Sequence, residues 1–103
     1  MKYSHGWELL HNAVHILCSH GSQRERLIHA VCELNNLNLN NLPSDLQRDF
    51  KGFMDDMVAQ PSSGKEGAIT TTINSFNDAK IQKAVDSIVS FYDSICRYRE
   101  PSI

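Results

Sequence analysis

Apolar residues recur every three or four positions along four stretches of the chain, which is the spacing of one face of an α-helix. Polar residues occupy the opposite face of each stretch, so each helix should be amphipathic. We therefore predict helices over residues 4–19, 22–35, 44–59 and 78–98. Their apolar faces predict an all-α fold, a compact single-domain bundle of four to five short helices over residues 1–103.

The segment at 68–76, AITTTINSF, fits two local structures. Ile69, Ile73 and Phe76 have helical spacing. The threonine run and the alternation of isoleucine with threonine are typical of a strand. We favour a short helix, because a single strand would have no partner.

The predicted core consists of the apolar residues at the centre of the helical faces. They are Trp7, Leu10, Val14, Leu17, Leu27, Val31, Leu34, Phe50, Phe53, Ile81, Val85, Ile88 and Ile95.

Turn-forming and capping residues separate the predicted helices. Gly21 can take the left-handed conformation that closes a helix, and Ser22 with Glu25 has the pattern of a capping box. The stretch NNLNLNNL at 35–42 combines asparagines with leucines, which predicts an irregular but packed connector. The stretch PSSGKEG at 61–67 is predicted to be flexible.

Length, composition and charge narrow the range of functions. The chain has 103 residues, 41% of them hydrophobic, and a formal net charge of −2, values typical of one globular domain. No basic surface is indicated, so nucleic acid is not an expected partner. The chain has no apolar signal segment after Met1 and no apolar run long enough to span a membrane. It also has no cofactor-binding motif, so no cofactor is predicted.

The three cysteines, Cys18, Cys32 and Cys96, are odd in number and far apart. This pattern predicts no disulfide framework and favours a reducing compartment, the cytoplasm. Each cysteine lies on or beside an apolar face, so we expect all three to be small core or boundary residues.

Two histidines in the first helix, His11 and His15 in HNAVH, could hold one face of a zinc ion, with Cys18 as a third ligand. The stretch differs from the zinc-protease signature HExxH at Asn12, because an amide cannot take the proton from metal-bound water. Both histidines lie on the polar face of the predicted helix. We therefore predict solvated side chains and no metal site.

The stretch RERLIH places Arg24 five residues before His29. It resembles the Rx4–6H motif of HEPN-type ribonucleases, which are small helical bundles whose two motif copies face each other across a dimer. The resemblance implies that Arg24 would hold a phosphate and that His29 would transfer a proton. Glu25 stands where that family commonly has Asn, Asp or His, so the resemblance is kept as the alternative to a binding protein.

In the last helix, Phe91 and Tyr98 lie seven residues apart, to one side of the main apolar stripe. They could widen the core, or they could form an edge that binds a partner, with Arg97 or Arg99 at its rim. The absence of a complete catalytic motif favours a binding protein over an enzyme. We predict a small cytoplasmic helical adaptor, inhibitor or regulatory protein that binds another protein or a second copy of itself as a homodimer.

Overall fold

The computed structural model describes residues 2–98, which form α-helices, one short 3-10 helix and turns, with no strand. The all-α prediction is confirmed. In chain order the elements are α1 (Ser4–Leu17), α2 (Gln23–Leu34), η1 (Leu39–Asn41), α3 (Ser44–Met57), α4 (Gly64–Asn74) and α5 (Asp78–Cys96).

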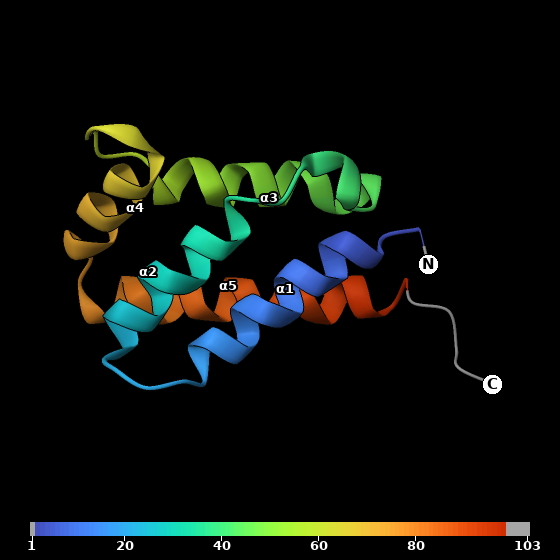
Figure 1. Cartoon of the computed structure of the whole chain (residues 1–103), viewed down its shortest axis with the longest axis horizontal. Coiled ribbons are helices and arrows are strands. Elements are labelled where there is room, and N and C mark those ends of the chain that lie inside the picture. Colours follow the sequence, from blue (N-terminus) through green and yellow to red (C-terminus); the bar gives the residue numbers. More distant parts are fainter. Residues whose placement is uncertain (1, 99–103) are drawn as a thin grey trace.

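α4 connects α3 to α5 at one end of the molecule (Figure 1). α3 and α5 run lengthwise in opposite directions, and α4 crosses one end of the molecule between them. α1 and α2 form a helical hairpin, in which α1 packs against α5 and α2 packs against both α4 and α5. Within residues 2–98, no helix is both long and apolar enough to cross a membrane.

The core lies where the hairpin of α1 and α2 meets α4 and α5. Burial of these apolar side chains is the main source of stability in a chain of this size. The fully buried aliphatic side chains include Leu10, Leu27, Val31, Leu34, Ile69, Ile73, Ile88 and Ile95. Phe50, Phe53 and Ile81 are also buried, as predicted.

The buried face of α1 is rotated relative to the prediction. Leu9 and Ala13 are buried beside Leu10. Small side chains allow helices to pack closely, and α1 presents Gly6 and Ala13 on this side. Three residues of α1 that were predicted for the core are consequently only half-buried at its edge, and they are Trp7, Val14 and Leu17. Val85 of α5, also predicted for the core, is half-buried as well.

The ambiguous segment is helical as far as Asn74, where α4 ends, and α4 begins at Gly64 within the stretch predicted to be flexible. Thr72 faces the core and is 2% exposed. Its hydroxyl accepts a hydrogen bond from the Gln60 backbone N–H at 2.9 Å, so the buried polar group has a partner. A threonine therefore fits the buried face, which explains why the sequence pattern resembled a strand.

The turn between α1 and α2 contains the predicted capping residues in slightly different places. Ser22 caps α2, because its hydroxyl accepts a hydrogen bond from the Glu25 N–H at 3.1 Å. Gly21 has the left-handed conformation, with φ of 101°. However, α1 ends at Leu17 with Cys18 as its C-cap, so Gly21 shapes the loop and not the helix end.

The asparagine-rich connector is packed, as predicted. Asn38 caps the 3-10 helix, because its side chain accepts a hydrogen bond from the Asn40 N–H at 3.0 Å. The Asn41 side chain in turn accepts one from the Asn38 N–H at 3.2 Å. Leu42 is 2% exposed. Gly6 of α1 lies directly against this connector, and a Cβ at Gly6 would overlap the carbonyl oxygen of Asn41. The connector is therefore fixed between α1 and α3.

Candidate protein-binding surfaces

Phe91 packs within the chain. Its ring lies edge-on to the rings of Phe50 and Phe53, both from α3, with distances between ring centroids of 5.4 Å and 5.6 Å. The side chain is half-buried. Phe91 therefore joins α5 to α3, and its predicted role in binding a partner stays a prediction.

Tyr98 lies at the end of α5 and is 42% exposed. Its ring is edge-on to Tyr3 at 6.0 Å, and its hydroxyl donates a hydrogen bond to Asp45 at 2.5 Å. This hydrogen bond raises the pKa of Tyr98, as do burial and the charge of Asp45. Tyr98 and Phe91 thus contact different residues, and the structure does not join them into one cluster.

Of the two arginines predicted at the rim of the partner-binding edge, the structure describes one. Arg97 forms an ion pair with Asp93 at 3.1 Å, and both side chains are at least 70% exposed. Such an exposed pair contributes little to stability. Arg99 lies outside the described residues.

The polar face of α1 is less solvated than predicted. The His11 ring stacks on Trp7 at 4.7 Å, and its Nδ1 lies 3.3 Å from the Tyr92 hydroxyl oxygen. His11 is half-buried because α5 brings Tyr92 beside α1. His15 is exposed, as predicted, with its ring 4.4 Å from that of His11.

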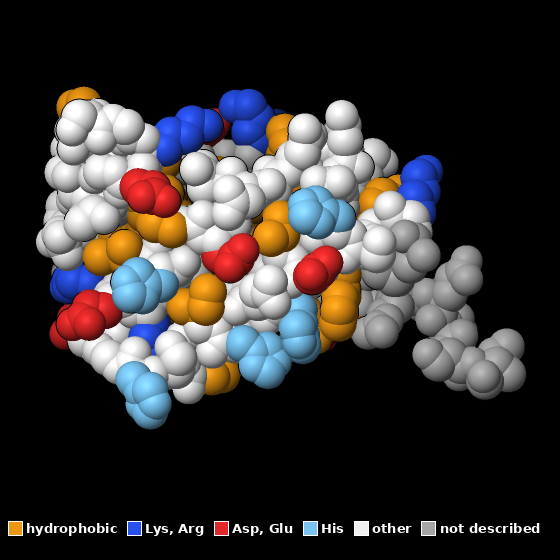
Figure 2. Space-filling model, in the orientation of Figure 1, with side chains coloured by type: hydrophobic (Ala, Val, Ile, Leu, Met, Phe, Trp, Pro, Cys, Tyr) orange, Lys and Arg blue, Asp and Glu red, His pale blue; other side chains and the backbone are white. Residues whose placement is uncertain are grey.

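Histidine side chains gather on the face formed by α1 and α2 (Figure 2). Among residues 2–98, however, no three His, Cys, Asp or Glu side chains are placed to hold a metal ion together. Cys18 is exposed at the C-cap of α1, contrary to the core or boundary position that we expected. His11, His15 and Cys18 therefore do not form a three-ligand site in this structure.

The two residues of the ribonuclease-like motif have separate environments. The Arg24 guanidinium donates a hydrogen bond to the carbonyl oxygen of Ile73 at 2.6 Å, near the C-terminal end of α4. His29 is exposed. Five residues along a helix correspond to a rotation of about 140°, so the two side chains leave α2 in different directions. Arg24 binds a helix end, where carbonyl groups lack intrahelical partners.

Replacing Arg24 by alanine should lower the free energy of unfolding by about 1–2 kcal/mol, because a charge-assisted hydrogen bond to the end of α4 is lost. His29→Ala, on the exposed side of the same helix, should change it by less than about 0.5 kcal/mol. Urea denaturation measures both. Equal effects of the two substitutions would contradict this role of Arg24, and RNA cleavage that is lost in His29→Ala would support the ribonuclease alternative.

The three cysteines are free thiols in different environments. Burial and the nearby charge of Glu66 raise the pKa of the Cys32 thiol. A raised pKa reduces the thiolate fraction at neutral pH, and the thiolate is the reactive form. Cys32 is also half-buried, whereas Cys18 is exposed.

Alkylation at pH 7 should therefore modify Cys18 before Cys32. Glu66→Gln should speed the labelling of Cys32, because it removes one of the two causes of the raised pKa. Time-resolved iodoacetamide labelling with peptide mass spectrometry measures both rates. Faster labelling of Cys32 than of Cys18 in the native protein would contradict the structure.

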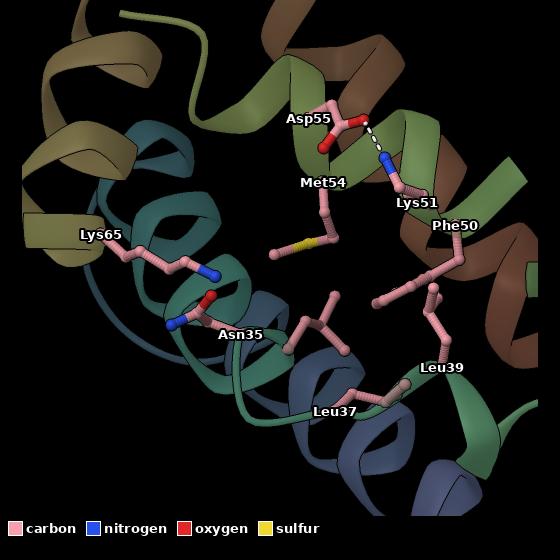
Figure 3. Close-up of a pocket in the computed structure, with 9 residues that line it drawn as sticks. Asn35, Leu37, Leu39, Phe50, Lys51, Met54, Asp55 and Lys65 are labelled. Carbon is pink, nitrogen blue, oxygen red and sulfur yellow. Dashed lines mark hydrogen bonds and ion pairs between the residues drawn. The ribbon is translucent and has the colours of Figure 1, made fainter. Parts of the chain in front are cut away.

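A groove lies between α3, the connector and α4, with a volume of about 140 Å³ (Figure 3). Met54 points into it from α3, and Leu37 and Leu39 face it from the connector. We call this the α3 groove. Its apolar lining is Leu34, Leu37, Leu39, Phe50 and Met54, and its polar lining is Asn35, Lys51, Asp55 and Lys65.

The α3 groove continues along α3 as a shallower hollow. Leu39 and Lys51 line both spaces, and the hollow adds Ser44, Gln47 and Arg48. The helical pattern of the sequence does not reveal this surface, because its residues come from separate segments of the chain. The leucines in the connector were the available signal, since they are too apolar for a solvated turn.

The chain matches no protein-family profile, no curated protein and no solved structure.

Proposed function

We propose that the chain is a small helical adaptor, inhibitor or regulator that acts by binding another protein, and that the α3 groove is its binding site. The observation that carries this proposal is the set of apolar side chains that line the opening. Leu37, Leu39 and Met54 are only half-buried, although each packs against the core. Apolar side chains grouped at an opening are typical of sites that bind other proteins.

The size of the groove supports a protein partner. Sites for small molecules usually have volumes of about 300–1,000 Å³ and enclose most of the ligand. The space beside Leu37 and Met54, of about 140 Å³, is smaller and suits one large side chain from another protein, whereas the continuation of about 370 Å³ is shallow and open to solvent. The three free cysteines agree with a reducing compartment such as the cytoplasm.

A pair of matched variants tests the proposal. Leu37→Asn removes an apolar side chain from the groove in a connector that already contains asparagines. Val89→Asn makes the same kind of change on α5, where Val89 is 46% exposed. Binding to proteins that co-purify with the tagged chain from its native cell should weaken about 30-fold in Leu37→Asn, which corresponds to about 2 kcal/mol for a hot spot.

Val89→Asn should leave binding unchanged, and thermal melts should show that both variants fold. If Leu37→Asn is unstable, Lys65→Glu replaces it, because Lys65 is exposed. Partners that bind both groove variants as tightly as the wild-type chain would contradict the proposal. A homodimer seen in sedimentation and lost in Leu37→Asn would identify a second copy as the partner.

A further inference from the structure

The α3 groove is positively charged on a chain that is negatively charged overall. Three cations, Arg48, Lys51 and Lys65, line the groove and its shallow continuation, against one anion, Asp55. The whole chain has ten Lys and Arg against twelve Asp and Glu. The lining of the groove and its continuation therefore has a net positive charge, opposite in sign to the net charge of the whole chain.

Two of these cations are available to a partner. Lys65 and Arg48 are exposed, and neither forms an ion pair with any residue in the described part of the chain. Lys51 pairs with Asp55 at 2.9 Å, and both side chains are 64% exposed. An ion pair this exposed is weak, so Lys51 can exchange the Asp55 carboxylate for a carboxylate of the partner at little cost in free energy.

The length of the groove suits a helix. Its α3 lining extends from Ser44 to Asp55, which is about three helical turns and about 17 Å. A partner helix that places side chains at i, i+4 and i+7 needs about 10 Å, so it fits within this length. Residues 2–98 contain no strand, so the described part of the chain offers no sheet edge to an extended peptide.

We infer that the α3 groove binds an acidic amphipathic helix of another protein. One large apolar side chain of that helix enters the space between Leu37 and Met54, and its carboxylates pair with Lys65, Lys51 and Arg48. This inference rests on the function proposed above and specifies the chemistry of the partner. Charges at the rim also steer the partner during association, so binding weakens as salt is added.

An unbiased helical peptide library displayed on phage, selected against the full chain, tests this inference. The selected peptides should carry two large apolar residues at i and i+4 or i and i+7, flanked by Asp or Glu. Synthetic copies, measured by fluorescence anisotropy, should bind about tenfold more weakly to Lys65→Glu. Their binding should also weaken between about 50 and about 500 mM NaCl.

Lys83→Glu is the matched control, because Lys83 is exposed on α5 outside the groove and the substitution changes the net charge equally. Its affinity for the peptides should stay within about twofold of that of the wild-type chain, because salt screens exposed charges at a distance. Leu37→Asn should weaken binding of the same peptides by about 30-fold, as expected for a hot spot.

The other outcomes separate the inference from the proposed function. Neutral or basic peptides that require Leu37 would overturn the acidic partner and leave the groove as the binding site. A dimer of the chain that requires Leu37 would likewise overturn it, because the occupant would be a second copy. If the selection yields no peptide whose binding depends on Leu37, both the inference and the proposed function are overturned.

Discussion

Gly6→Ala should lower the free energy of unfolding by about 2 kcal/mol or more, even though alanine is the better helix former. The added Cβ would overlap the carbonyl oxygen of Asn41 and lie 3.3 Å from Cδ1 of Ile95. The first contact is with backbone, which cannot rotate away as a side chain can. Either α1 or the connector must therefore move, and the packing between them is lost.

Gly52→Ala is the matched control for this substitution. Gly52 lies inside α3, and a Cβ there would meet no atom within 4 Å. The same change should raise the free energy of unfolding by about 0.5–1 kcal/mol, because glycine loses more backbone entropy on folding. Urea denaturation of both variants should therefore show changes of opposite sign in the free energy of unfolding. If Gly6→Ala stabilises the protein, α1 and the connector are not in close contact.

Ile88→Ala should lower the free energy of unfolding by about 2–5 kcal/mol. Ile88 is in the middle of α5 and is 0% exposed, so the smaller side chain leaves a cavity. The adjacent Val89 is 46% exposed, and Val89→Ala should change the stability by less than about 0.5 kcal/mol. Chemical denaturation compares the two neighbours, and similar losses at both positions would mean that α5 presents a different face to the core.

The sequence predicted the helices because their apolar residues repeat with a helical period. That period is strong enough in α3 and α5 for the buried positions Phe50, Ile81, Ile88 and Ile95 to be found directly. Apolar spacing did not find the rotation of α1. The close contact there depends on Gly6, a residue that contributes nothing to a hydrophobic pattern.

The surfaces were harder to predict than the core because they depend on contacts between distant segments. His11 and Tyr92 are 81 residues apart, so α1 alone gave no sign that its polar face was covered. Phe91 contacts Phe50 and Phe53 of α3, and the sequence could not show that these two rings would face it. The α3 groove likewise exists only once the connector, α3 and α4 have come together.

Photo-cross-linking from inside the α3 groove tests directly whether this surface contacts a partner protein. Benzoylphenylalanine in place of Met54 should form a discrete adduct with another protein when the native cells are irradiated. The same probe in place of Ser90, which is exposed on α5, serves as the control. We expect an adduct at position 54 that disappears when Leu37→Asn is added, and no such adduct at position 90. No adduct at position 54, or the same adduct at both positions, would contradict the proposed role of the groove.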